Sequence, residues 1–305
     1  MIKLKLDIPK SFLREEERCG HIVTREMKEL WAVELDLLSE LKRVCEKYNL
    51  HFSADSGTLL GAVRHKGFIP WDNDIDIFML REDYEYLCRI APKEFKVPYS
   101  LVTYKEDCRS SMGFAKLYNL HTTAIENPYI NRIQGVFIDI FPLDNVPVDI
   151  KLFEQQKKDV FRFARKLGRL TYCTLAYNIK EPAPLVKKIG RVILHSYYLL
   201  TKRGSKYGLS LFKAYEVACK RYNTIPTKYV AAISYYTLKT KDLVRRTDLL
   251  NPIEVDFEFT KIPIIQHYDE YLKSLYGNYM VFIKGTELHT LFIIDTNKPY
   301  VHYLK

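Results

Sequence analysis

The sequence has little glycine, no paired cysteines and no long apolar run, and each shortage excludes a class of protein. Only 12 of its 305 residues are glycine, so long flexible or low-complexity linkers are not expected. Its six cysteines are scattered without a Cys-x-x-Cys pair, which favours reduced thiols over a disulfide framework or a zinc site. No run approaches the roughly 18 apolar residues needed to span a bilayer.

Several well-known catalytic signatures are also missing. The sequence contains no His-x₃-His spacing, no Gly-x-Ser-x-Gly elbow, no Walker loop and no Gly-x-Gly-x-x-Gly fingerprint. Residues 1–9 alternate apolar and charged side chains and lack the apolar core of a signal peptide. We therefore expect a cytoplasmic protein, and a peripheral contact with the inner face of the cell membrane is compatible with this location.

The charge balance is strongly basic, with 47 Lys and Arg against 37 Asp and Glu. Such an excess serves nucleic acid, an anionic membrane face or phosphorylated substrates, and it is equally typical of a solvated surface. A basic stretch with an apolar and aromatic face occupies residues 187–203. It could lie on an anionic membrane, although packing of the apolar stripe on its own domain is the favoured interpretation.

Hydrophobic periodicity predicts an α+β protein. Helices are expected over 24–49, 84–90, 151–177, 185–201 and 268–276, where Gly277 fits a C-cap. A short helix is expected to begin near residue 57, and another, after 185–201, is expected to end near residue 222. Strands are expected over 51–54, 74–79, 99–104, 112–118, 122–126, 135–141, 229–234 and 253–259. This order predicts a mixed sheet flanked by helices in residues 1–149, a helical insertion in 150–225 and a mixed region in 226–305 that packs back on the core.

The acidic residues Asp72, Asp74 and Asp76 are spaced two apart. On a strand, side chains at this spacing point to one face. Carboxylates held close together repel unless a cation or protons lie between them, which indicates Mg²⁺ or Mn²⁺. Asp72, at the entrance of the expected strand, is the least certain ligand of the three. A pair of turn-capping aspartates at a solvated edge is the alternative.

A second acidic position lies inside an otherwise apolar strand. Asp139 interrupts the run Gly135–Pro142, and a buried charge without a partner is costly. A metal ion, a catalytic role as base, or a salt bridge would each satisfy it. If its strand lies beside Asp74 and Asp76, Asp139 could complete the metal site.

The short helix that precedes the acidic strand offers groups for phosphate. Gly57 and Thr58 lie at its expected start, where free N–H groups and the helix dipole favour an anion, although an ordinary N-cap is the alternative. Arg64, His65 and Lys66 at its other end could grip a phosphoryl group, or merely complement the helix C-terminus.

Two further cations are weaker candidates for phosphate. Lys116, within Phe114–Leu117, and Arg132, near the turn at Gly135, are both placed where they could reach a phosphate group. A solvated face is nevertheless the favoured interpretation for each of them.

The residues from Gly57 to Ile77 closely resemble the signature of the LicD family, which includes the fukutin-type proteins. The resemblance continues in Gly135–Asp144, similar to the second acidic strand of the family, and in Tyr268–Met280, similar to its C-terminal motif. Asn73 stands where the family usually has an aspartate. The resemblance implies a nucleotidyltransferase-type fold, with Asp74 and Asp76 as metal ligands, Asp139 as the third carboxylate and Gly57 and Thr58 as the phosphate-binding turn.

The resemblance also implies an activity. It suggests metal-dependent transfer of a phosphorylated alcohol, such as phosphocholine, from a CDP-linked donor to a hydroxyl of a cell-surface glycan, which could be lipid-linked, with release of CMP. Asp139 is then the candidate base. One alternative is a nucleotidyltransferase that uses an NTP and releases pyrophosphate. Another is a non-catalytic basic protein that binds nucleic acid or a membrane, but nucleic acid is not the expected partner.

Overall fold

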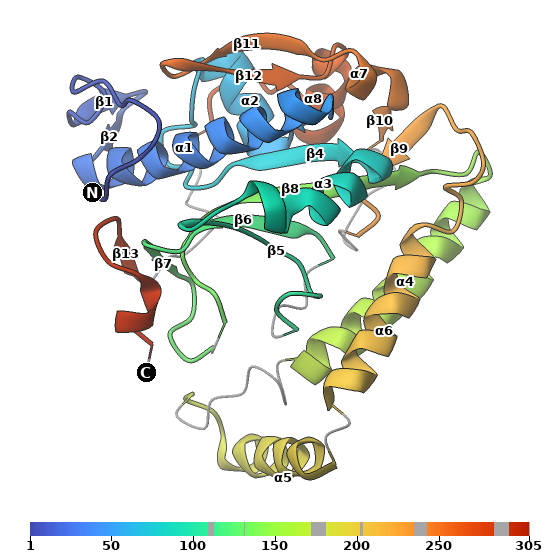
Figure 1. The fold of residues 1–305 in the computed structure, drawn as a ribbon. Coiled ribbons are helices and arrows are strands. Elements are labelled where there is room, and N and C mark those ends of the chain that lie inside the picture. Colours follow the sequence, from blue (N-terminus) through green and yellow to red (C-terminus); the bar gives the residue numbers. More distant parts are fainter. Residues whose placement is uncertain are drawn as a thin grey trace.

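The computed structural model describes residues 1–108, 113–130, 132–171, 181–201, 204–234, 243–283 and 293–304. A mixed β-sheet lies at its centre (Figure 1). The sheet order is β10-β9-β8-β4-β3, and β6 and β5 extend it from the first half of β8. The strands are β3 (Ser53–Ala54), β4 (Asp76–Leu80), β5 (Tyr99–Val102), β6 (Ala115–Asn119), β8 (Val136–Asn145), β9 (Tyr229–Ala231) and β10 (Val244–Arg245).

The strand β8 is long enough to have three neighbours. It runs parallel to β4, and it pairs antiparallel with β6 along its first half and with β9 at its end. Its alternation decides which residues enter the helix-covered core. Ile138 and Ile140 are fully buried in the main apolar cluster, together with Leu117 of β6 and Ile77 of β4. Residues 137, 139 and 141 therefore point to the other face of the sheet.

Two helices contact the sheet on its apolar face, α1 (Arg25–Tyr48) and α3 (Arg81–Glu94). The side chain of Thr24 caps α1 by accepting a hydrogen bond from the N–H of Met27 at 3.3 Å. At its other end, Asn49 takes the left-handed conformation with φ 52°. The predicted helix over 24–49 is thus confirmed, and a stripe of apolar residues with a spacing of three and four explains its burial.

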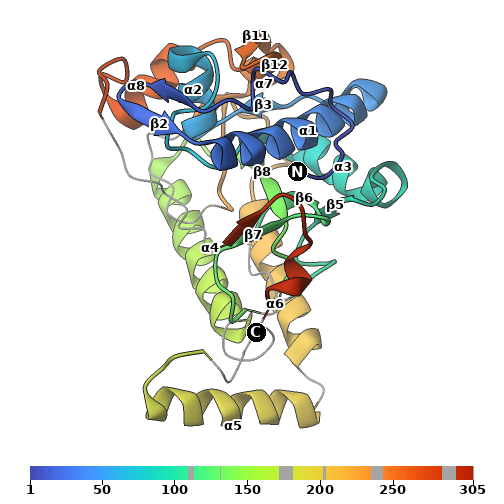
Figure 2. The same ribbon diagram turned by 90° about the vertical axis from the view of Figure 1, so that its left-hand side faces the viewer.

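A second group of elements covers the edge of the sheet at β3 and β4 (Figures 1 and 2). The helix α2 contacts β4, the β11–β12 hairpin and α8, and β12 contacts β3. These elements are α2 (Ser56–His65), α7 (Arg246–Leu250), β11 (Ile253–Phe257), β12 (Thr260–Ile264) and α8 (Tyr268–Tyr276). Gly277 ends α8 with φ 68°, as the sequence predicts.

The helical middle of the chain extends away from the sheet. The long helices α4 (Ile150–Leu170) and α6 (Gly204–Cys219) pack against each other and form a second apolar cluster with Ala231 and Ile233. The helix α5 (Leu185–Thr201) lies across their far end (Figures 1 and 2). Residues 172–177 of the predicted helix 151–177 and Met112 of a predicted strand lie outside the described residues.

Short elements complete the described chain, and the fold class agrees with the prediction. Two further small antiparallel pairs are formed by β1 with β2, which follow each other in the chain, and by β7 with β13, which are distant in the chain. The bounds are β1 (Glu16–Arg18), β2 (His21–Val23), β7 (Thr123–Ile125), β13 (Ile293–Asp295) and the 3₁₀ helix η2 (Tyr300–His302). The mixed sheet with helices confirms an α+β protein, whereas the predicted division into 1–149, 150–225 and 226–305 stays a prediction.

Candidate active site

Asp76 and Asp139 are register partners on adjacent parallel strands. Asp76 begins β4 and lies opposite Asp139 of β8, and neighbouring strands are about 4.8 Å apart. The N–H of Asp139 donates to the carbonyl of Ile75 at 2.8 Å, which fixes this register. Both side chains occupy the face of the sheet opposite to α1 and α3. The predicted condition that the strand of Asp139 lies beside the acidic segment is therefore confirmed.

The other two aspartates of the acidic segment precede the strand. We expected Asp74 and Asp76 to share one strand, but β4 begins only at Asp76, so this expectation is wrong. Asp72 and Asp74 lie in the loop that leads from α2 to β4, and both are buried. The carbonyl of Asp72 accepts a hydrogen bond from the indole Nε1 of Trp31 at 2.8 Å. A rigid core residue thus holds the loop against the sheet.

Buried negative charge dominates the electrostatics of this region. The pKa of Asp76 is raised well above its ordinary value, first by burial and then by the charges of four other carboxylates, those of Asp74, Asp139, Asp55 and Asp72. A buried carboxylate whose pKa is raised by neighbouring carboxylates attracts a proton or a cation. An all-oxygen set of this kind suits a hard divalent ion such as Mg²⁺ or Mn²⁺.

The described residues contain no group of three acidic, histidine or cysteine side chains that is already arranged as a metal cage. The chemistry of the carboxylates, rather than preformed coordination geometry, is what fits a divalent ion. The metal site predicted at Asp74, Asp76 and Asp139, with Asp72 as a further candidate, therefore stays a prediction.

Lys116 supplies the counter-charge to Asp139. The two residues are register partners on β6 and β8, and the Nζ of Lys116 lies 2.7 Å from Oδ1 of Asp139. The ammonium group also lies 3.3 Å from the centre of the Phe137 ring, a favourable cation–π distance. The expectation that Lys116 lies on a solvated face is wrong, because its side chain is only 7% exposed. Of the alternatives for Asp139, the structure contains the salt bridge.

Arg132 is also less exposed than predicted. Its guanidinium is paired with the carboxylate of Glu126, and its side chain is 17% exposed. The expectation of a solvated face is wrong for this residue too.

The start of α2 fixes the backbone of Asp76 from both sides. The N–H of Asp55 donates to the carbonyl of Asp76 at 3.0 Å, and the N–H of Asp76 donates to the hydroxyl of Thr58 at 2.9 Å. Asp55 caps the helix by accepting from the N–H of Ser56 at 2.5 Å, which realises the N-cap interpretation of this turn. Thr58 therefore positions Asp76, whatever its role toward phosphate.

Gly57 lies in direct proximity to the acidic loop. An ideal Cβ on Gly57 would come within 2.6 Å of Oδ2 of Asp72. The absence of a side chain is thus what allows the loop to fold back over the helix N-terminus. The helix start and the carboxylates form one continuous site, and the predicted phosphate role of this turn stays a prediction.

The three residues at the other end of α2 differ in character. Arg64 and Gly57 are separated by about 10 Å along a helix axis at 1.5 Å per residue. Arg64 donates to the carbonyl of Tyr279 at 2.8 Å and to Nε2 of His65 at 2.9 Å. Lys66 is exposed and ends the helix with φ 53°.

His65 is not the cation that the sequence suggested. Burial, followed by the charge of Arg64, lowers its pKa to about 4, so the imidazole is neutral at neutral pH. Because its Nε2 accepts from Arg64, the proton of the neutral ring is on Nδ1. The cationic groups at this end of α2 are therefore Arg64 and Lys66.

Glu258 and Tyr271 support the site, and sequence reasoning did not single out either side chain. Glu258 in the β11–β12 turn binds Arg18 in a bidentate pair at 2.6 and 2.8 Å, and it accepts from the N–H of Phe68 at 3.0 Å. The hydroxyl of Tyr271 donates to Oδ1 of Asp55 at 2.9 Å. Tyr271 belongs to the C-terminal motif, which was the available signal, but Glu258 only continues an alternating strand pattern.

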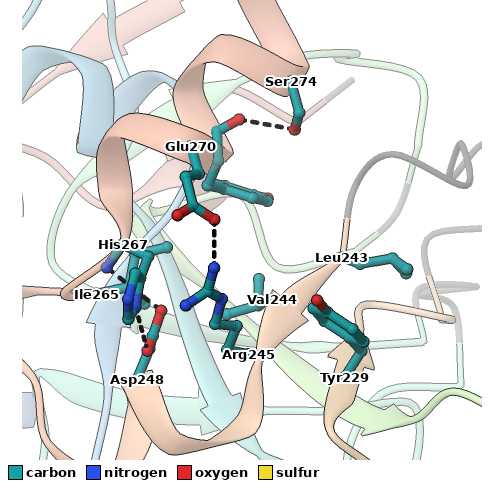
Figure 3. A pocket seen from close by; sticks show the side chains of 10 residues that line it. Tyr229, Leu243, Val244, Arg245, Asp248, Ile265, His267, Glu270 and Ser274 are labelled. Atoms are coloured by element: carbon teal, nitrogen blue, oxygen red, sulfur yellow. Dashed lines mark hydrogen bonds and ion pairs between the residues drawn. The ribbon is translucent and has the colours of Figure 1, made fainter.

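A separate pocket of about 170 Å³ lies among β9, β10, α7 and α8 (Figure 3). Nδ1 of His267 lies 2.8 Å from Oδ1 of Asp248, and the guanidinium of Arg245 pairs with Glu270 at 2.5 Å. Tyr271 also lines this pocket. The pocket is thereby connected to Asp55, the capping residue of α2, through the Tyr271 hydroxyl, although four of its charged or titratable side chains already form the two pairs above.

Comparison with known proteins identifies the domain that carries these carboxylates. Residues 49–167 match the family model described as LicD/FKTN/FKRP, nucleotidyltransferase domain. The lipopolysaccharide cholinephosphotransferase LicD of Haemophilus influenzae is 28% identical over 256 residues, which cover 83% of this chain and 91% of the relative. An uncharacterized protein of Rickettsia prowazekii is 40% identical over 65 residues, or 21% of this chain and 24% of its own length.

The mixed sheet, the paired carboxylates and the matched domain define a transferase of the nucleotidyltransferase-fold class. Residues 49–167 match the LicD/FKTN/FKRP family model, so the resemblance seen in residues 57–77 is confirmed for this domain. The chain is also similar to the Haemophilus LicD protein over 83% of its length.

Proposed function

We propose that this protein transfers a phosphorylated alcohol, with phosphocholine as the first candidate, from a CDP-linked donor to a hydroxyl of a cell-surface glycan and releases CMP. The single observation that supports this best is the side-by-side placement of Asp76 and Asp139 within a LicD-type nucleotidyltransferase domain. Similarity to a lipopolysaccharide cholinephosphotransferase over 91% of that relative supports the choice of phosphocholine and of a lipopolysaccharide-like acceptor.

Asp74, Asp76 and Asp139 are the residues that we propose to hold Mg²⁺ or Mn²⁺, with Asp72 as a further candidate. A bound divalent ion supplies charge neutralisation for the diphosphate of the donor and stabilises the transition state of phosphoryl transfer. The raised pKa of Asp76 among four other carboxylates supports this role.

The reaction is an in-line displacement at the distal phosphorus of the donor. A bond forms between the acceptor oxygen and this phosphorus, and the bond from the phosphorus to the bridging oxygen breaks, so that CMP leaves with the electron pair. Asp139 accepts the proton of the attacking hydroxyl. Lys116, which lies 2.7 Å from the Asp139 carboxylate, holds that side chain in place and balances its charge.

The helix α2 provides the binding groups for phosphate in this proposal. Gly57 and Thr58, at its N-terminus, lie beside Asp72 and Asp76, and the N–H groups of a helix N-terminus favour anions. Arg64 and Lys66, at the other end of the helix, are placed to contact a more distant part of the donor or the acceptor. We place the protein in the cytoplasm, where it would meet a lipid-linked glycan at the inner face of the membrane.

The test is a donor screen with the full chain. Purified protein is incubated with Mg²⁺, CDP-choline and extracted cell-envelope glycans, and CMP is measured by chromatography; CTP is tested in parallel for pyrophosphate. We expect CMP with CDP-choline, abolished by Asp76→Asn. The matched control Asp256→Asn alters an exposed aspartate and should leave turnover unchanged. Pyrophosphate from CTP without CMP from CDP-choline would instead identify the nucleotidyltransferase alternative.

A further inference from the structure

The helix α5 presents an apolar surface that no other described part of the protein covers. None of the residues of Leu185–Thr201 is buried. Val186, Leu200 and Leu185 are 83%, 82% and 72% exposed. The expectation that the apolar stripe of this helix packs on its own domain is therefore wrong, because the stripe is exposed. An exposed apolar surface of this extent marks a site of interaction with a partner.

Most of the exposed apolar residues lie on one side of α5. At 100° per residue, eight of its nine large exposed hydrophobic residues fall within an arc of about 160°, and Leu194, which is 39% exposed, lies outside it. The arc consists of Leu185, Val186, Ile189, Val192, Ile193, Tyr197, Leu199 and Leu200, and all of them are large exposed hydrophobic residues. Tyr198, which lies about 180° from the middle of this arc, packs against the apolar cluster of α4 and α6. The helix is thus attached by one side and turns its apolar side outward.

The position of α5 in the fold leaves this side accessible. Figures 1 and 2 both show α5 at the far end of the α4–α6 pair, distant from the central sheet. Its main neighbour among the described elements is α6. A flat surface as large as the helix, about 25 Å long at 1.5 Å per residue, could approach the arc without meeting the rest of the described protein.

The charges of α5 favour an anionic surface as the partner. The segment 185–201 carries Lys187, Lys188 and Arg191 and contains no acidic residue, within a chain of net charge +10. Arg191 pairs with Glu181, which precedes the helix, at 2.6 Å, so Lys187 and Lys188 supply the net positive charge of this region. These cations lie outside the apolar arc, as in helices that lie in the interface of a bilayer. Two copies of α5 that packed face to face would bring like charges together, which disfavours a second copy of this chain as the partner.

We propose that α5 is a docking helix that lies in the plane of an anionic phospholipid bilayer, with its apolar arc among the lipid chains. No helix in the described ranges is both long and apolar enough to cross a membrane, so the contact is a peripheral one. The proposal goes beyond the transfer reaction and does not depend on it, but it would bring the active site to acceptors held in a membrane.

Vesicle sedimentation of the full chain tests this proposal. The probe is a phosphatidylcholine vesicle with or without about 30 mol% phosphatidylglycerol, an anionic lipid of the kind that basic segments bind. We expect binding to the anionic vesicles that weakens with added salt. The variant Val186→Ser/Ile193→Ser/Leu200→Ser should lower the partition coefficient at least about tenfold, because it removes apolar groups that enter the lipid.

A matched control makes the same change elsewhere on the surface. Ile22→Ser/Val148→Ser/Val301→Ser replaces residues that are 61%, 98% and 57% exposed, and it should bind like the unmodified protein. Lys187→Gln/Lys188→Gln should weaken binding by about fivefold for each charge. Its control, Lys10→Gln/Lys93→Gln, removes two exposed charges from other elements and should have little effect. Circular dichroism checks that each variant is folded.

Equal binding by the α5 serine variant and its control, or no binding to the anionic vesicles, would overturn the proposal. Sedimentation velocity detects the rival partner. A dimer that the serine variant converts to a monomer, without any vesicle binding, would assign the arc to a second copy of the chain. Asp76→Asn should bind vesicles normally, so failure of the transfer reaction and failure of membrane docking are distinguishable.

Discussion

The ammonium of Lys116 lies 2.7 Å from the carboxylate of Asp139, and both side chains are at least nine-tenths buried between β6 and β8. Removal of one member of such a pair leaves an uncompensated charge in a poorly solvated place. The pair therefore links the stability of the sheet to the candidate active site, because Asp139 is also the residue proposed as the base.

We predict that Lys116→Met lowers the free energy of unfolding by about 3 kcal/mol or more, since it leaves Asp139 buried without its cation. Adding Asp139→Leu should recover most of that loss, because the double variant buries neither charge of this pair, yet it should remain without transfer activity. Urea unfolding and CMP release measure the two effects. A single variant as stable as the unmodified protein would show that the ion pair contributes little.

Gly57→Ala should reduce turnover by at least about tenfold, because the new Cβ would lie 2.6 Å from Oδ2 of Asp72 and displace the acidic loop. Gly168→Ala is the matched control. It makes the same change inside α4, where a Cβ meets nothing within 4 Å, and it should be neutral or slightly stabilising. Unchanged kcat and KM for Gly57→Ala would contradict the proposed continuity between the helix start and Asp72.

Glu258→Ala should lower the free energy of unfolding by about 2 to 3 kcal/mol, because it removes a bidentate charged pair with Arg18 and the acceptor of the Phe68 N–H. We also expect weaker turnover, since residues 66–68 join α2 to the acidic loop. Glu254→Ala on the same hairpin removes a more exposed carboxylate, which is 48% exposed. An equal loss for both variants would argue against a specific role for Glu258.

The neutral state of His65 gives a stability that depends on pH. Its pKa is about 4 in the folded protein against 6.5 for an ordinary histidine, so the unfolded chain binds the proton more readily. The stability from this residue is fully present above pH 6.5 and is lost as the pH falls toward 4. Urea unfolding of His65→Gln should show a smaller loss across this range than the unmodified protein.

The exposed His302 provides the control for this pH effect, since His302→Gln changes a histidine outside the candidate site. The pH dependence that comes from His65 should be retained in this variant, because His65 itself is intact. Direct observation of the His65 ring by NMR should place its titration well below the ordinary histidine value of 6.5. A protonated His65 at pH 6 would contradict the contact in which Arg64 donates to its Nε2.

The sequence alone determined much of the local structure, because short-range periodicity and capping decide it. The spacing of apolar residues was sufficient for α1, and Gly277 was sufficient for the end of α8. The acidic segment was recognisable as a LicD-like motif. The residue at which its strand begins was not predictable, because contacts of Asp72 to Trp31 and to α2, rather than local propensity, hold the preceding loop.

Tertiary structure alone decided which charged groups meet. Asp76 and Asp139 are 63 residues apart in the chain and become neighbours only through the parallel register of β4 and β8. The burial of Lys116 against Asp139 and the neutral state of His65 depend on the surroundings that other elements create. For α5 the sequence showed an amphipathic basic helix, but only the attachment through Tyr198 established that its apolar side faces outward. Periodicity defines the faces of a helix, whereas packing decides which of them remains exposed.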